Sequence, residues 1–193
     1  MRPRILPGYT SRPSPNQSDR NGCEPTLLVI HYTASMSDDG DLRWLRSDQS
    51  NVSAHFVIAR DGRVTQLVPL DRAAWHAGIS KWVYQGEQRR DVNDFSVGVE
   101  LCNAGLVFRS GSWLSVNLGG RMQSYRGADP VEAGGGLWEP CGEAQLAALG
   151  RLVEDLKEAG YSLEMVGHNE IAPSRKRDPG PAFPWARYRE TAG

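Results

Sequence analysis

The sequence predicts one α/β domain in which a mixed central β-sheet is flanked by helices. Three observations support this fold: short apolar or alternating segments typical of strands, one long amphipathic segment typical of a helix, and a length of 193 residues, which is enough for one domain with a proper core. Strands and helices mixed along the chain favour a sheet covered by helices, with functional residues at the strand ends.

The first central strand is expected at residues 26–30. Its β-branched and apolar residues are typical of a strand that is buried on both faces. Because alternate strand residues share a face, Leu27, Val29 and His31 should point the same way. A short amphipathic helix around residues 42–45 is expected to follow this strand.

Local signals of a hairpin and of a long helix complete the core elements. Segments 54–59 and 64–68 flank an Asp-Gly dipeptide, which is favoured in tight hairpin turns. Residues 142–159 carry an apolar stripe at helical spacing. Residues 165–167 then form a short strand that delivers His168.

A second central strand is expected at residues 95–101, where large and small residues alternate strictly. Its larger apolar residues share one face, while Ser96, Gly98 and Glu100 share the other. A carboxylate on the face of smaller residues has room above it. This strand is therefore a candidate to carry a functional side chain.

Two segments lack a clear pattern. Residues 1–24 are rich in proline, serine, asparagine and arginine, and we expect an extended N-terminal segment that wraps the surface or is loosely ordered. Residues 103–140 contain many glycines, and we expect a long excursion over the surface there. A single domain is accordingly expected to span residues 25–193.

Composition and charge exclude several classes of function. The formal net charge of -1 removes any general argument for nucleic-acid binding. No apolar stretch is long enough for a membrane-spanning helix, and residues 1–15 lack the hydrophobic core of a signal peptide. We expect a monomer that is cytoplasmic as synthesised. The cysteines are interpreted as three reduced thiols. A disulfide bond between Cys102 and Cys141 is the alternative.

Two histidines and an aspartate form a candidate metal site. His168 and Asp178 lie ten residues apart on a segment punctuated by glycine and proline, and His31 ends the first central strand. Two neutral imidazoles and one carboxylate leave one coordination position of a zinc ion open, whereas a structural site is closed by four ligands. The pattern therefore predicts one catalytic zinc ion at a hydrolytic site.

Two further side chains suit the chemistry of such a site. Glu100, near the end of its strand, is the candidate to take a proton from the attacking water and return it to a leaving amine. Lys176 precedes Asp178 by two residues, so its ammonium is the candidate to stabilise a developing oxyanion. An ionisable group on an otherwise apolar strand is costly unless it has a purpose.

Several motifs in order resemble the zinc-dependent N-acetylmuramoyl-L-alanine amidases of the AmpD-like amidase type 2 family. They are the Leu-Val-Ile-His-Tyr-Thr-Ala run at 28–34, Trp-His-Ala-Gly at 75–78, the segment 93–101, and the block 168–183. The resemblance implies hydrolysis of the amide between N-acetylmuramic acid and L-alanine, in a fold that holds zinc in a surface groove. It places the ligands on His31, His168 and Asp178, and the catalytic pair on Glu100 and Lys176.

Three departures from relatives of this superfamily matter. Some phage amidases carry a tyrosine where this chain has Ala54, which favours Glu100 for proton transfer. Some relatives use cysteine as the third ligand, where this chain has Asp178. The glycine-rich segment 103–140 is longer than in the shorter muropeptide-recycling members, so the resemblance does not decide the exact substrate.

Four residues are candidates to bind substrate. Trp75 and His76 belong to a small glycine-flanked loop that allows close approach of a ligand, so we expect them to line the groove. Arg90 suits the carboxylates of a stem peptide, and Asn93 is a further candidate to bind substrate. Plain loop packing and surface solvation are the alternatives for these residues.

The expected partner is peptidoglycan or a muropeptide, in one of three settings. The first, which we favour from the sequence, is a phage or prophage endolysin that cleaves the intact wall after release through membrane holes. The second is a cytosolic amidase that recycles anhydro-muropeptides. The third is a non-catalytic module that only binds peptidoglycan, against which the joint presence of His31, His168, Asp178 and Glu100 argues.

Overall fold

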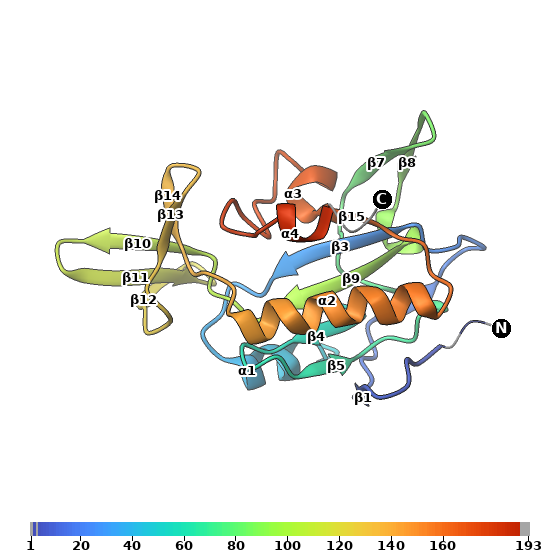
Figure 1. Ribbon diagram of the computed structural model, residues 1–193, viewed down its shortest axis with the longest axis horizontal. Coiled ribbons are helices and arrows are strands. Elements are labelled where there is room, and N and C mark those ends of the chain that lie inside the picture. The colour runs from blue at the N-terminus through green and yellow to red at the C-terminus, as the bar shows by residue number, and fades with distance from the viewer. Residues whose placement is uncertain (1, 3, 190–193) are drawn as a thin grey trace.

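A mixed six-stranded sheet forms the centre of the computed structural model, which describes residue 2 and residues 4–189 (Figure 1). Strands β4, β9, β3 and β15 run parallel, while β5 pairs with β4 as an antiparallel hairpin and β1 joins β5 in parallel. The predicted mixed sheet is thereby confirmed. In spatial order the strands are β1 (Thr10–Ser11), β5 (Val64–Gln66), β4 (Phe56–Ile58), β9 (Ser96–Leu101), β3 (Leu27–Tyr32) and β15 (Glu164–Gly167).

The long helix α2 (Glu143–Glu158) covers one face of this sheet (Figure 1). Leu149, Leu152 and Leu156 recur at helical spacing and are fully buried in the main core cluster. Gly160 follows the helix with φ of 88°, a conformation that glycine adopts without steric cost and that commonly ends helices. The apolar stripe seen in the sequence therefore forms the contact between α2 and the sheet.

Strands β3 and β9 alternate their side chains as predicted. Leu28 and Ile30 lie in the core cluster under α2, whereas Leu27 and Val29 lie in a separate cluster on the opposite face. The register pairs His31 with Glu100 across the two parallel strands. Both side chains follow the parity of Leu27 and Val29, so they lie on the face that α2 leaves uncovered.

The N-terminal segment is held along the domain by strand pairing and buried polar contacts. Its strand β2 (Gln17–Asp19) pairs with β6 (Arg72–Ala74), and β1 extends the main sheet. The Arg20 guanidinium is buried and donates to the carbonyls of Leu70, Asp94 and Ser96. The segment expected to wrap the surface thus contributes edge strands and a buried anchor.

The glycine-rich excursion expected at residues 103–140 is folded as a second sheet. Five antiparallel strands extend to one side of the main sheet (Figure 1). Gly111, Gly119 and Gly134 have positive φ and lie in the turns between strands, so the glycines mark hairpins rather than disrupted structure. In spatial order the strands are β12 (Arg121–Ser124), β11 (Trp113–Leu118), β10 (Leu106–Ser110), β14 (Gly136–Trp138) and β13 (Val131–Ala133).

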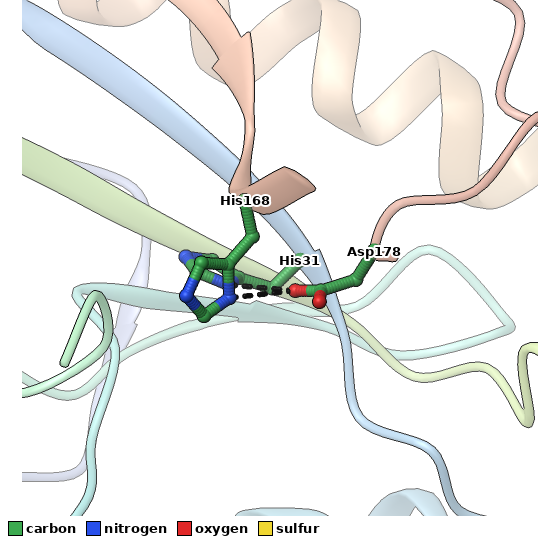
Figure 2. Close-up of side chains that lie close together, drawn as sticks. All are labelled: His31, His168 and Asp178. Carbon is green, nitrogen blue, oxygen red and sulfur yellow. Dashed lines mark hydrogen bonds and ion pairs between the residues drawn. The ribbon is translucent and has the colours of Figure 1, made fainter. Parts of the chain in front are cut away.

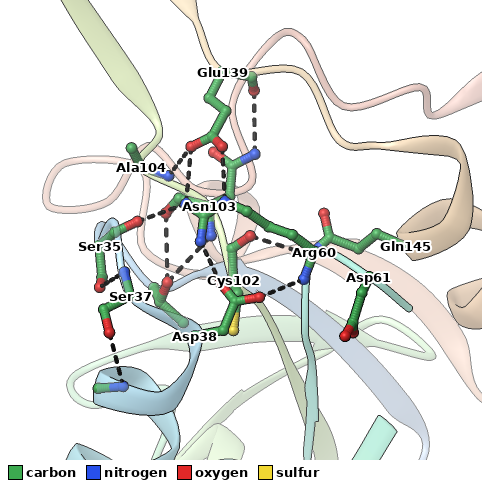
Figure 3. Close-up of polar contacts among 12 residues, drawn as sticks. Ser35, Ser37, Asp38, Arg60, Asp61, Cys102, Asn103, Ala104, Glu139 and Gln145 are labelled. Atoms are coloured by element: carbon green, nitrogen blue, oxygen red, sulfur yellow. Dashed lines mark hydrogen bonds and ion pairs between the residues drawn. The ribbon is translucent and has the colours of Figure 1, made fainter. Parts of the chain in front are cut away.

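One arginine connects this second sheet to the main domain (Figure 3). Arg60, just after β4, donates to the Glu139 carboxylate that follows β14, with Nε 2.8 Å from Oε1. The same guanidinium contacts Asp38, the first residue of α1 (Asp38–Trp44). Glu139 also accepts a hydrogen bond from the Ala104 amide at 2.5 Å. The expected helix around residues 42–45 is therefore present as α1 and is tied to both sheets.

The remaining elements are short. An exposed hairpin of β7 (Lys81–Tyr84) and β8 (Glu87–Arg90) precedes the 3-10 helix η1 (Val92–Phe95), and α3 (His168–Ile171) and α4 (Ala186–Arg189) follow β15. The three cysteines are free thiols. Within the described residues, no helix is both long enough and apolar enough to cross a membrane.

Replacing Leu152 with alanine should lower the free energy of unfolding by about 2–5 kcal/mol, because it leaves a cavity between α2 and the sheet. The measurement is urea denaturation. The matched control is Ile79→Ala, whose side chain is 92% exposed, and which should cost about 0.5 kcal/mol or less. Equal losses in the two variants would contradict the packing described for α2.

Candidate metal centre

Three side chains from distant parts of the chain converge at one point, as Figure 2 shows. His31 Nδ1 lies 2.8 Å from His168 Nδ1 and 3.0 Å from Asp178 Oδ2, and His168 Nδ1 lies 2.9 Å from the same oxygen. All three residues are buried. The structure therefore brings together the three side chains that the sequence predicted to bind a metal.

Strand pairing explains why the two histidines meet. Strands β15 and β3 are parallel neighbours with Gly167 opposite Ile30, so His168 and His31 follow at the same end of the sheet. Asp178 returns to this end because the Asn169 amide donates to the Asp178 carbonyl at 2.9 Å. The ligand set thus depends on two adjacent strands and one loop that folds back on itself.

The donor set fits a zinc ion in both type and spacing. Zinc binds nitrogen and oxygen ligands at about 2 Å, so two ligand atoms of one ion lie at most about 4 Å apart. His168 Nε2 donates to the Ala77 carbonyl at 3.1 Å, which leaves Nδ1 of the neutral ring without a proton. Three protein ligands leave one position for water or substrate.

Burial and mutual contact favour the protonation states that a metal requires for two of these side chains, His31 and Asp178. Burial lowers the pKa of His31 to about 4. Burial alone would raise the pKa of Asp178, but its contacts with His168 and His31 outweigh that effect and hold the pKa below its usual range. Neutral imidazole and ionised carboxylate are the forms that coordinate metal ions.

The two predicted catalytic residues line the same cavity as the ligands. This cavity has a volume of about 460 Å³, and Glu100 and Lys176 face it together with His31, His168 and Asp178. Glu100 Oε2 is buried and has no hydrogen-bond partner among the described residues. An unpaired carboxylate oxygen beside a candidate metal site is free to accept or donate a proton.

The environment favours the protonated form of Glu100. Burial is the main cause of a pKa well above the ordinary 4.5, and the negative charges of Asp178 and Asp41 raise it further. The Lys176 ammonium acts in the opposite direction. A carboxyl group whose pKa is raised in a cavity is typical of general acids and bases.

The four candidate substrate-binding residues fall in different places. Trp75 and His76 line the cavity, but both ring nitrogens of His76 lie 3.0 Å from protein atoms, one on His31 and one on Ser96. Asn93 Oδ1 accepts from the His76 and Ala77 amides and so supports the loop. Arg90 lies on the exposed β8 hairpin, outside the residues that line the cavity.

Sequence reasoning missed several residues that shape this site. Arg175 donates to the carbonyls of Ala77 and Ile79, at 2.8 and 2.9 Å, and thereby fixes the loop that contacts both histidine ligands. Ser96 contacts His76 from β9. A signal for Ser96 existed, since it shares the small-residue face of its strand with Glu100. No comparable local signal marks Arg175 within its basic run.

Comparisons with known proteins agree with this geometry. The profile of the family described as N-acetylmuramoyl-L-alanine amidase (Amidase_2) matches residues 21–181. The 1,6-anhydro-N-acetylmuramyl-L-alanine amidase AmpD of Escherichia coli K12 is 34% identical, over 95% of this chain and 92% of its own. The N-acetylmuramoyl-L-alanine amidase AmiD of the same strain is 37% identical, over 85% of this chain and 52% of its own.

Solved structures extend the comparison. The E. coli AmiD complex with anhydro-N-acetylmuramic acid-L-Ala-D-gamma-Glu-L-Lys matches with a TM-score of 0.63 and 32% identity, over 93% of this chain and 60% of that one. A selenomethionine AmpD derivative matches with a TM-score of 0.61 and 29% identity, over 96% and 95%. The endolysin LysCS of Clostridium intestinale, at TM-score 0.55 and 14% identity over 97% of each chain, shares the fold alone.

The raised pKa of Glu100 predicts a pH-dependent effect of Glu100→Gln on the metal-free protein. The folded chain keeps a proton that the unfolded chain loses above the ordinary pKa of 4.5, so wild-type stability falls as pH rises through the raised pKa. The variant lacks this loss. Its free energy of unfolding relative to wild type should therefore increase as the pH rises above the ordinary pKa of 4.5, measured by urea denaturation.

The matched control for that series is Gln88→Ala, because Gln88 is exposed on β8 and does not titrate. Its difference from wild type should stay constant over the same range. A constant difference for Glu100→Gln as well would contradict the raised pKa.

Proposed function

This chain belongs to the N-acetylmuramoyl-L-alanine amidase family, and from that premise we propose that it uses one zinc ion to hydrolyse the amide between N-acetylmuramic acid and L-alanine. The observation that carries the proposal is the convergence of His31, His168 and Asp178 within 3.0 Å of one another, on a cavity shared with Glu100 and Lys176.

His31, His168 and Asp178 are the residues that would hold the ion. When bound there, zinc supplies Lewis acidity and lowers the pKa of water. The protein itself buries these three side chains away from bulk solvent. Burial also lowers the pKa of His31, which favours the neutral imidazole that can bind a metal. These features suit a catalytic rather than a structural site, because three protein ligands are available and the cavity reaches them.

Glu100 and Lys176 supply the proton transfer and the charge stabilisation. The unpaired Oε2 of Glu100 accepts a proton from the attacking water and returns it to the departing alanine nitrogen. The Lys176 ammonium, on the loop beside Asp178, stabilises negative charge on the carbonyl oxygen as the tetrahedral intermediate forms. Both groups face the same cavity, so both can reach one amide bond.

A soluble anhydro-muropeptide is the substrate class that the comparisons favour. AmpD, named for a 1,6-anhydro-N-acetylmuramyl substrate, is similar along nearly its whole length, whereas the endolysin match shows the fold alone. The cavity volume of about 460 Å³ suits a small ligand, and Trp75 and Arg177 add an aromatic face and a cation that can contact a sugar–peptide fragment.

Wall lysis by an endolysin, the setting that the sequence favoured, becomes the alternative outcome of the substrate test. A non-catalytic binding module is disfavoured because all three candidate ligands are present together with a carboxylate oxygen that is buried and unpaired. Such an ionisable group is costly in a protein that only grips its ligand.

Purified protein should contain one zinc ion per chain and lose its activity with a chelator. Glu100→Ala should keep the zinc but lower turnover by roughly 100- to 10,000-fold, because it removes the proton acceptor and no ligand. Metal analysis and amide hydrolysis are the two measurements. Glu87→Ala, on the exposed β8 hairpin, is the matched control and should behave as wild type. Full activity of Glu100→Ala would refute the assignment of the base.

The substrate class is tested by mass spectrometry of products from intact sacculi and from soluble anhydro-muropeptide. Exclusive cleavage of the soluble fragment between the muramic acid and alanine moieties is the expected result. Release of free stem peptides from intact sacculi would instead support the endolysin alternative.

A further inference from the structure

The His76 imidazole lies directly behind the metal ligand His31. His76 Nδ1 is 3.0 Å from His31 Nε2, and His76 Nε2 is 3.0 Å from Ser96 Oγ. The Ser96 hydroxyl in turn lies 2.6 Å from the Val92 carbonyl. All three side chains of this hydrogen-bond chain are buried. Bulk water therefore does not compete for these contacts.

The direction of every bond in the chain follows from its last member. A carbonyl only accepts, so the single Ser96 hydroxyl proton points to Val92, and Ser96 Oγ must accept from His76 Nε2. A neutral imidazole has one N–H, so His76 Nδ1 is an acceptor and His31 Nε2 must donate to it. His31 Nδ1 is then left with a lone pair that faces His168 and Asp178.

We propose that the chain Val92–Ser96–His76 sets the tautomer of His31 that presents Nδ1 to the metal. His76 is thus a positioning residue that acts through His31. The inference rests on the proposed function in one respect, since zinc is the ion that the oriented lone pair receives. A partner that fixes the tautomer and ring orientation of a ligand also raises its basicity.

The same loop performs the equivalent task for the second histidine ligand. The carbonyl of Ala77, the residue after His76, accepts from His168 Nε2 at 3.1 Å and so leaves His168 Nδ1 unprotonated. Asn93 Oδ1 accepts hydrogen bonds from the consecutive amides of His76 and Ala77, at 3.1 and 2.8 Å. One loop therefore orients both imidazoles, through a side chain in one case and a carbonyl in the other.

Strand β9 provides the space that this arrangement needs. A Cβ atom added at Gly98 would lie 2.5 Å from His76 Cγ, so a larger residue there would displace the ring. Ser96, Gly98 and Glu100 share one face of the strand. That face thus carries the hydroxyl that directs His76, the gap that admits its ring, and the proposed catalytic base.

The wild-type protein tests the tautomers directly. Long-range proton–nitrogen NMR correlations of ¹⁵N-histidine-labelled protein, recorded without metal and with zinc, distinguish protonated from unprotonated ring nitrogens. We expect a proton on His76 Nε2 in both states, and protons on Nε2 of His31 and His168 when zinc is bound. A proton on His76 Nδ1 in the metal-free protein would overturn the inference, and this result does not depend on whether the protein is an amidase.

Two substitutions of His76 then measure what the contact contributes to zinc binding. His76→Leu removes the acceptor, and zinc affinity from chelator competition should fall roughly 10- to 100-fold. His76→Asn keeps an acceptor oxygen near the Nδ1 position and should stay within about tenfold of wild type. Unchanged affinity in His76→Leu, or an equal loss in both variants, would overturn the proposed role.

Ser96→Ala completes the series, with Ser110→Ala on the exposed strand β10 as its matched control. Ser96→Ala should weaken zinc binding by up to about tenfold, since His76 is free to adopt either tautomer, whereas Ser110→Ala should have no effect. Equal affinities in the two serine variants would overturn the part assigned to Ser96. Failure of wild type to bind zinc would instead refute the proposed function, while the tautomers of the metal-free protein still decide this inference.

Discussion

The parallel pairing of β3 with both β9 and β15 is the constraint on which the site depends. It places His31 opposite Glu100 on one side and brings His168 to the same strand end on the other. A register slip of one residue would turn His31 toward the core under α2. Because that core is apolar and closely packed, burial of Leu28, Ile30 and their neighbours fixes the register, and the register in turn fixes the site.

Electrostatics at this strand end favour the arrival of a cation. Contacts with His168 and His31 hold the pKa of Asp178 below its usual range, while burial and the charge of Asp178 keep Glu100 from ionising easily. A divalent ion would offset the negative charge of Asp178 and so ease deprotonation of Glu100. Metal binding and readiness of the proposed base are thereby coupled. The Lys176 ammonium, on the loop beside Asp178, also lowers the pKa of Glu100.

Support for the site comes from surrounding segments that the central sheet does not include. The loop at residues 75–78 contacts both candidate histidine ligands, and Arg175 and Asn93 hold that loop in place. On the other side, Arg60 joins α1 to the second sheet through Asp38 and Glu139. The central strands therefore fix the direction of the ligands, whereas side chains from these outer segments fix their orientation and protonation.

Much of this molecule was evident from local sequence pattern. The apolar strands, the stripe of α2, the hairpin at β4 and β5, and the candidate ligands with Glu100 follow from periodicity and residue chemistry, which involve near neighbours or a recognisable motif. The second sheet was not evident, because its polar strands are defined by pairing across turns. The contacts of His76 with His31 and Ser96 were not evident either, because the sequence predicted only that His76 lines a substrate groove. Which atom faces a buried imidazole depends on how separate strands and loops pack, and that is decided only in three dimensions.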